Sequence, residues 1–250
     1  MRYEILMILF RWIVMTLKKK MSLFVFILTV VILLTASGCV NQSENVKSSS
    51  GVLFGDSCPA EPVVCPGCDY DDISDKNLKC ANLSGAMLSG KYLISVSLNS
   101  ANLEKANLNH AYLRFADLSN ANLNGAYMEY VDFTGASLEN AMLKNTRIID
   151  GEFSNANLRG VIITDSYSPS VNFKFADLKY AVLKDSILLG SDFTGADLEG
   201  ADLSNTNFAL SYFINANLKG AKLKGADLNG TLLTGATWIN GSVFQEDFLK

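Results

Sequence analysis

Residues 101–110 read Ala-Asn-Leu-Glu-Lys-Ala-Asn-Leu-Asn-His, which is one five-residue unit, A-(D/N)-L-x-x, written twice. The unit recurs in register along most of the chain. From Ile73 to Phe248 every fifth residue is apolar, with Ser168 as the one exception. Two places before each of these, residues 81–236 carry mainly alanine and otherwise Ser, Thr, Gly or Val, except at Lys91. A fixed short period of this kind predicts a repeat architecture.

A period of five fits neither a helix nor a flat strand. A helix would distribute the leucines all around its surface, and a strand would point alternate leucines to opposite faces. The pattern closes if each unit forms one side of a four-sided coil, so that every leucine points to the axis. Twenty residues then make one coil, and coils stack through parallel ladder bonds. Residues twenty apart form one column, and one such column carries five phenylalanines, which predicts an aromatic ladder: Phe133, Phe153, Phe173, Phe193 and Phe213.

These units resemble the pentapeptide-repeat family over residues 71–241. The resemblance implies an all-β fold, a right-handed quadrilateral parallel β-helix. This is a solenoid of about 8–9 coils, roughly 40 Å long. The four-sided shape rests on the resemblance, whereas the inward columns follow from the spacing, and the phenylalanine column supports a twenty-residue coil independently.

The two ends of such a rod require caps. One coil buries four large side chains worth roughly 1.5–3 kcal/mol each, but ordering its twenty residues costs about 30 kcal/mol. Stability therefore depends on stacked neighbours. We expect a cysteine-rich N-terminal cap at 58–80 and a C-terminal cap at 242–250. Ser242 and Gln245 have capping-box spacing, which favours a short helix in that tail, with a last irregular coil as the alternative.

The front of the chain has the features of an export signal over residues 1–38. Lysines at 18–20 precede an apolar run at 23–34, and small residues follow. Met15 is a plausible true start, because it gives a leader of ordinary size. Residues 1–14 are too short and too interrupted by charge to span a bilayer.

Residues 36–39, Ala-Ser-Gly-Cys, resemble the bacterial lipoprotein cleavage box, although Ala36 stands where leucine is usual. The resemblance implies that Cys39 becomes the lipidated first residue, anchoring the protein to an envelope membrane, at the cell surface or in the periplasm. The alternative is an incidental cysteine near an ordinary cleavage site. Residues 39–57 then form a flexible tether, rich in Asn, Gln, Ser and Gly.

Four further cysteines, Cys58, Cys65, Cys68 and Cys80, precede or enter the first units. An even number in an exported chain favours two disulfides, of undetermined connectivity, that staple the N-terminal cap. A tetrathiolate zinc site is one alternative, because residues 65–68 form a tight C-x-x-C pair. A redox thiol pair is another. Haem attachment is excluded because Asp69 stands where histidine is required.

Catalytic motifs are absent from the sequence. His110 is the only histidine, at a turn position, and the acidic residues occupy turn positions of the repeat. No nucleophile elbow or phosphate-binding loop is present. We therefore expect no enzyme activity, no cofactor and no small-molecule substrate. Nucleic-acid binding is not predicted either.

Some members of the resembled family mimic DNA and bind type II topoisomerases through an acidic surface. Residues 71–250 carry 20 acidic and 15 basic side chains, and no side of the coil is strongly anionic. A functional export leader would also remove access to such an enzyme. This function therefore remains the alternative.

The outward positions turn apolar in the middle coils, around the broken core position Ser168. A contiguous apolar patch often marks a partner interface, and a failure of local rules is expected at functional sites. The competing explanation is that such residues simply suit exposed strands. The sequence thus predicts an exported lipoprotein with a non-catalytic scaffold role. An unknown protein or a second copy would bind at this patch, which comprises Met142, Ile149, Ile162, Tyr167, Pro169, Val182, Ile187 and Leu189.

Overall fold

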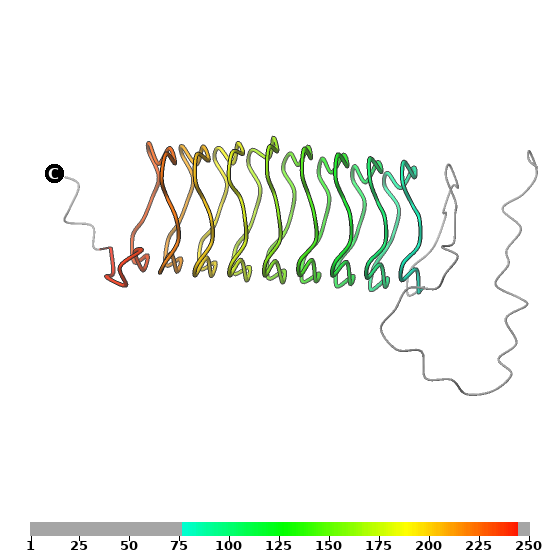
Figure 1. The fold of residues 1–250 in the computed structure, drawn as a ribbon, viewed down its shortest axis with the longest axis horizontal. Coiled ribbons are helices and arrows are strands. Elements are labelled where there is room, and N and C mark those ends of the chain that lie inside the picture. The colour runs from blue at the N-terminus through cyan, green and yellow to red at the C-terminus, as the bar shows by residue number, and fades with distance from the viewer. Residues whose placement is uncertain (1–76, 245–250) are drawn as a thin grey trace, which may run out of the picture. The chain divides into compact units, whose positions relative to one another are not determined.

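The computed structural model describes residues 77–244, which wind into a four-sided coil whose turns stack into a rod (Figure 1). Successive coils are joined by parallel bridges between residues twenty apart, from Asn77 with Ser97 to Asn217 with Thr237. Each side contributes a single bridging residue, and this part of the chain contains no longer strand and no helix. The predicted right-handed quadrilateral β-helix is confirmed. At twenty residues per coil the described range makes about eight coils.

The four sides are numbered here by their inward residues in one coil, namely Phe133 on the first side, Leu138 on the second, Leu143 on the third and Ile148 on the fourth. Columns continue these positions in steps of twenty. All four inward side chains are fully buried. The spacing therefore positions every outward residue as well, because the residues flanking an inward one face solvent.

Backbone hydrogen bonds between coils explain why the period must be constant. The Leu103 N–H donates to the Asn122 carbonyl of the next coil at 2.7 Å, and the Asn122 N–H donates back to the Ala101 carbonyl at 2.9 Å. The Lys105 N–H donates to the Asn124 carbonyl at 2.9 Å. An inserted residue would break all of these bonds, since each joins fixed positions of adjacent coils.

The corners are tight turns with a left-handed residue. At a typical corner the Ala106 N–H donates to the Leu103 carbonyl at 3.0 Å, and Lys105 between them has φ of 56°. Every fifth residue from Cys80 to Gly235 shares this positive φ. A positive φ at the third of four residues is characteristic of a type II turn, which explains the frequent Gly and Asn there.

The core is filled by the inward columns and by the small residues beside them. The predicted phenylalanine ladder is confirmed on the first side, where ring centroids of successive members lie 5.0, 5.3, 4.9 and 4.8 Å apart. Phe208 of the fourth side packs edge-on against two of them, Phe193 and Phe213. The residue two places before each ring of the ladder is small, which leaves room for this close stacking: Val131, Gly151, Val171, Ser191 and Ser211.

At the C-terminal end of the rod, Ser242–Phe244 fold back on the last coil as a hairpin. The rest of the predicted cap, 245–250, lies outside the described residues, so the short helix stays a prediction. Val243 pairs antiparallel with Thr237, and the Phe244 N–H donates to the Ala236 carbonyl at 2.7 Å. The Phe244 ring lies 5.5 Å from that of Trp238. The hairpin gives the last coil partners for a ladder edge that no further coil covers. The expected leader, lipidation box, tether and most of both caps lie outside the described residues.

Candidate interaction surface

The fourth side carries the most exposed part of the predicted patch. Tyr167 and Ile187 are neighbours in its outward ladder and are 46% and 40% exposed. Leu189, which follows the inward residue of the same coil, is 38% exposed. Ile149 and Pro169 precede it in that column and are half-buried. These five residues form one apolar strip across three coils, called the fourth-side strip below.

The remaining predicted residues lie on the third side. Met142, Ile162 and Val182 bridge one another in register and are half-buried. The exposed corner column of Asn145, Asp165 and Asp185 separates them from the fourth side. The single patch expected from the sequence is therefore two parallel strips, because a polar corner lies between adjacent sides.

The positive charge of Arg147 is balanced within the fourth side. The Arg147 guanidinium forms an ion pair with the Glu129 carboxylate. It also lies 5.6 Å from the centroid of the Tyr167 ring, within the range of a cation–π contact. The basic residue at the edge of the fourth-side strip is thus paired, so the strip carries no unbalanced charge from it.

One edge of the fourth side differs from the ordinary corner. The Thr146 N–H donates to the Ser166 hydroxyl at 3.1 Å, and that hydroxyl donates to the Leu143 carbonyl at 3.0 Å. A hydroxyl from the next coil therefore stands between the two groups that bond directly elsewhere. The next corner in this column is bridged in the same way, by Ser186 between the Ser166 N–H and the Ile163 carbonyl.

The corner from Ser168 to Val171, at the opposite edge of the fourth side, is also bridged by a hydroxyl of the next coil. The Val171 N–H donates to the Ser191 hydroxyl at 3.1 Å. One coil further, the Ser191 N–H donates to the Ser211 hydroxyl at 3.0 Å, and this hydroxyl donates to the Leu188 carbonyl at 3.0 Å. At that corner the direct bond from the Ser191 N–H to the Leu188 carbonyl is kept as well, at 3.3 Å. Both corners that bound the fourth side are thus bridged where it carries the strip. Sequence reasoning missed this feature, although serine and threonine recur every twenty residues in the small-residue column.

Ser168, the exception in the inward pattern, lies in the core between these edges. It is fully buried, and its hydroxyl is the only buried side-chain polar atom of the described residues that lacks a hydrogen-bond partner. An unpaired buried hydroxyl costs free energy. The break in the core pattern and the bridged corners therefore fall in the same coils.

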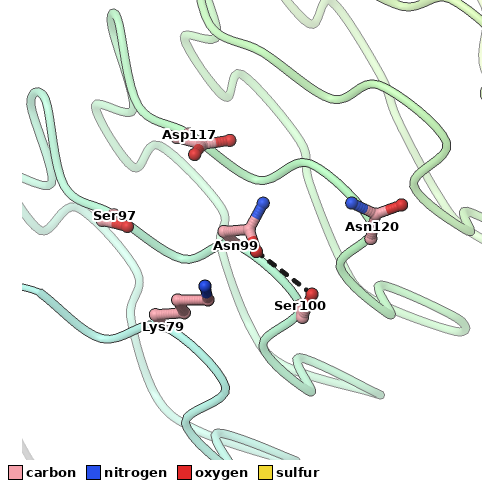
Figure 2. A pocket seen from close by; sticks show the side chains of 6 residues that line it. All are labelled: Lys79, Ser97, Asn99, Ser100, Asp117 and Asn120. Carbon is pink, nitrogen blue, oxygen red and sulfur yellow. Dashed lines mark hydrogen bonds between the residues drawn. The ribbon is translucent and has the colours of Figure 1, made fainter. Parts of the chain in front are cut away.

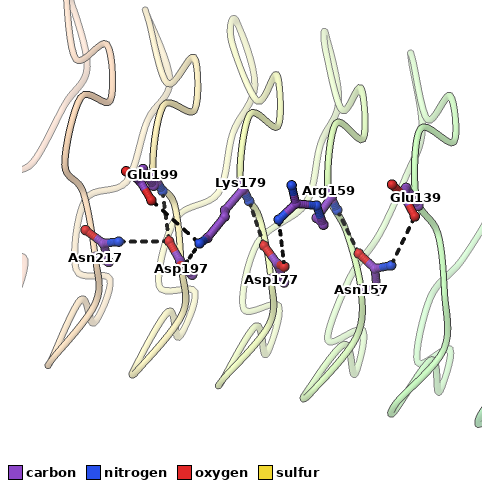
Figure 3. Close-up of polar contacts among 8 residues, drawn as sticks. All are labelled: Glu139, Asn157, Arg159, Asp177, Lys179, Asp197, Glu199 and Asn217. Atoms are coloured by element: carbon purple, nitrogen blue, oxygen red, sulfur yellow. Dashed lines mark hydrogen bonds and ion pairs between the residues drawn. The ribbon is translucent and has the colours of Figure 1, made fainter.

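The second side carries a ladder of alternating charges (Figure 3). The Arg159 guanidinium lies 3.3 Å from the Asp177 carboxylate, and the Lys179 ammonium lies 3.0 Å from that of Asp197. Each pair joins residues eighteen apart, so it runs diagonally between coils. The hydrogen bond to Asp197, and then its negative charge, raise the pKa of Lys179. Asp177 and Asp197 are thus each paired with a basic side chain of the same side.

A shallow polar hollow lies on the second side near the N-terminal end (Figure 2). Short side chains of adjacent coils create it, and the Ser100 hydroxyl donates to the Asn99 side-chain oxygen at 3.1 Å. It contains neither histidine nor cysteine and no pair of acids. The hollow therefore offers no catalytic set, and its lining residues are Lys79, Ser97, Asn99, Ser100, Asp117 and Asn120.

The other candidates from the sequence are His110 and the cysteines. His110 stacks on Tyr130 with ring centroids 5.0 Å apart. Cys80 is buried at the first coil, while Cys39, Cys58, Cys65 and Cys68 lie outside the described residues, so their pairing and lipidation stay predictions. Residues 77–244 hold no cluster of His, Cys, Asp or Glu suited to a metal ion. A helix able to cross a bilayer is also absent from this part of the chain.

A filled four-sided solenoid with regular outward ladders defines a class of proteins that present surfaces rather than a deep cleft. A family model described as pentapeptide repeats, in eight copies, matches residues 77–114, 106–145, 128–165, 172–209 and 211–237. The chain therefore belongs to the pentapeptide-repeat family.

Solved structures of the same family resemble the chain in fold. HetL, involved in heterocyst differentiation regulation in the cyanobacterium Nostoc, is 28% identical over 69% of this chain and 89% of its own, with a TM-score of 0.39. QnrB1, a plasmid-mediated fluoroquinolone resistance protein, is 18% identical over 64% and 89%, with a TM-score of 0.41. A thylakoid-lumen protein of Arabidopsis thaliana is 24% identical over 56% and 70%, with a TM-score of 0.15. No curated protein matches the chain significantly.

Proposed function

We propose that the chain is an exported, lipid-anchored protein that acts as a non-catalytic interaction scaffold of the cell envelope. The fourth-side strip is the surface where a protein partner binds. The observation that carries this proposal is the exposure of Tyr167, Ile187 and Leu189 side by side on a flat face. Exposed contiguous apolar surface is a feature of protein interfaces. The anchor rests on the leader and on Cys39, in the sequence alone.

The charge pattern favours a scaffold over a DNA mimic. Mimicry of DNA requires a continuous anionic surface, whereas Asp177 and Asp197 on the second side are paired with Arg159 and Lys179. The third possibility, a zinc or thiol-redox protein, depends on Cys58, Cys65, Cys68 and Cys80. Metal analysis and thiol titration of the purified protein distinguish it from a disulfide-stapled cap.

The anchor is tested by the intact mass of the protein expressed with its own leader and recovered from membranes. A chain beginning at Cys39 with added acyl mass is the expected result. Comparison with a reduced sample gives the number of disulfides. An unprocessed chain in the cytosol would overturn the anchor and would make the topoisomerase alternative the leading one.

The interface is tested with the variants Ile187→Asp and Leu189→Asp, compared with Leu232→Asp. Leu232 is 49% exposed in the outward ladder of the first side, away from the strip, and serves as a matched control. We expect wild-type protein in mild detergent to migrate in a complex larger than itself. The first two variants should lose that complex while their melting temperatures stay close to that of the control. A complex that survives in both variants contradicts the proposed surface.

A further inference from the structure

Asparagine is followed directly by glycine at three places in the chain, Asn124–Gly125, Asn229–Gly230 and Asn240–Gly241. Because glycine has no side chain, its backbone nitrogen can approach the side-chain carbonyl carbon of the preceding asparagine with little hindrance. Attack at that carbon closes a five-membered imide ring and expels the side-chain amide as ammonia. The dipeptide is the same at all three places, so any difference in reactivity between them comes from the fold.

The site at Asn124–Gly125 is held by the coil that follows it. The Gly125 N–H donates to the Lys144 carbonyl at 2.8 Å, and the Asn124 side-chain oxygen accepts from the Lys144 N–H at 2.9 Å. Both residues of the site are half-buried. The two groups that would react are therefore engaged with the backbone of the next coil, and ring closure there must first break two hydrogen bonds.

The site at Asn229–Gly230 has the same place in its five-residue unit but lies in the last coil of the described residues. Within residues 77–244 the Gly230 N–H makes no hydrogen bond, and the Asn229 side chain makes none either. The hairpin at the end of the rod provides acceptors for Gly235 and Trp238 instead. Asn229 and Gly230 are both exposed, so the reacting groups are accessible to water.

The turns at Asn124 and Asn229 are otherwise alike. In each, the asparagine N–H donates to the side-chain oxygen two residues earlier, at 3.1 and 3.0 Å. Each asparagine carbonyl accepts from an N–H of the preceding coil, at 2.9 and 2.8 Å, and each corner is closed by its direct backbone bond, at 3.0 and 3.1 Å. The comparison therefore isolates the two hydrogen bonds to the next coil.

The site at Asn240–Gly241 is exposed but is held within its own turn. The Gly241 N–H donates to the Trp238 carbonyl at 2.8 Å. The Asn240 side-chain oxygen accepts from the Ser242 N–H at 3.0 Å and from its hydroxyl at 2.7 Å. This site separates the effect of exposure, which it shares with Asn229, from the effect of hydrogen bonding.

We propose that Asn229–Gly230 is a site of spontaneous covalent modification, at which the asparagine loses ammonia and becomes aspartate or isoaspartate. The Gly230 nitrogen gives up its proton and bonds to the side-chain carbonyl carbon of Asn229. The bond from that carbon to the amide nitrogen breaks, and ammonia leaves with the proton. A water molecule then opens the imide. Opening at the side-chain carbonyl gives aspartate, whereas opening at the backbone carbonyl gives isoaspartate, whose main chain is one atom longer.

Either product changes the end of the fourth side. A carboxylate replaces a neutral amide in the coil that already carries Asp227 on that side, so the negative charge there increases at neutral pH. The modification thus converts an uncharged exposed position of the rod into an anionic one without any enzyme.

The test is peptide mapping by mass spectrometry of the purified full chain, stored at mildly alkaline pH, where the glycine nitrogen loses its proton more readily. We expect Asn229 to lose ammonia about tenfold faster than Asn124, because the latter must give up two hydrogen bonds first. Asn240 should also react more slowly than Asn229. In protein unfolded by urea the three rates should converge, since the dipeptide is the same and no coil holds it.

The variant Asn229→Gln is the matched control. Its longer side chain would have to close a less favourable six-membered ring, so the product at position 229 should disappear while Asn124 and Asn240 react as before. Equal or reversed native rates between Asn229 and either of the other two sites would show that the inference is wrong. A rate difference that persists unchanged in urea would do the same, because the fold would then not be its cause.

Discussion

The corner glycines provide a sharp test of how side chains of one coil constrain the next. Gly190 and Gly195 occupy adjacent corners of a single coil, with φ of 66° and 68°. A Cβ at position 190 would meet only the Ser170 hydroxyl oxygen, at 3.9 Å. A Cβ at position 195 would lie 2.6 Å from two ring carbons of Phe175 in the preceding coil. The two positions share backbone strain but differ in this contact.

The expected magnitudes follow from that difference. Alanine in the left-handed region costs about 1 kcal/mol, and this applies to Gly190→Ala and Gly195→Ala alike. The second variant must also displace the Phe175 ring. That ring is 64% exposed and can turn aside, so the additional cost is that of an unfavourable rotamer, about 1 kcal/mol. Gly195→Ala should therefore destabilise the protein by about twice as much as Gly190→Ala.

The assay is urea unfolding followed by circular dichroism, with both glycine variants in the wild-type and the Phe175→Ala backgrounds. Removing the ring should abolish the extra cost of Gly195→Ala and leave that of Gly190→Ala unchanged, a coupling of about 1 kcal/mol. Equal destabilisation by the two variants in the wild-type background would refute the reasoning. So would an extra cost that persists in Phe175→Ala.

Two further predictions concern single side chains. Ser168→Ala should raise the free energy of unfolding by about 1 kcal/mol, since it removes an unpaired hydroxyl from the core; a lower urea midpoint would contradict this. Burial alone would raise the pKa of Asp192. Hydrogen bonds from Thr194, whose N–H lies at 2.9 Å, and the Lys174 ammonium at 3.0 Å outweigh the effect of burial, so the pKa of Asp192 is lowered. A lowered folded-state pKa gives stability that is present above the unfolded-state pKa of about 3.9 and is lost as the pH falls through the folded-state value. Unfolding titrations from pH 6 to pH 2 should show that Asp192→Asn loses part of this acid dependence, and identical curves for variant and wild type would exclude the contribution.

The fold could be predicted from the sequence because one five-residue repeat determines the turns, the core and the stacking of coils together. Leu103 and its equivalents show which side chains point to the axis of the rod. The small residue two places earlier lets the backbone pass close to the core, and recurrence after twenty residues shows which side chains of neighbouring coils stack on one another. The phenylalanine ladder through Phe153 and Phe173 followed from that register alone. The predicted patch residues are also at outward positions, as expected, because alternation about an inward residue leaves no other place for them.

What the sequence by itself determined, then, is position: which residues face the axis, which face solvent, and which coil neighbours they meet. Only the tertiary structure showed which hydrogen bonds and side-chain contacts join one coil to the next. The Ser166 hydroxyl opens a corner whose groups lie twenty or more residues away in the chain, the Phe175 ring covers the glycine of the next coil, and a polar corner divides the apolar patch in two. The tail, too, forms a hairpin at the described residues because an open ladder edge needs partners. These outcomes depend on distances of a few ångströms between coils, and a one-dimensional pattern contains the order of residues but not those distances.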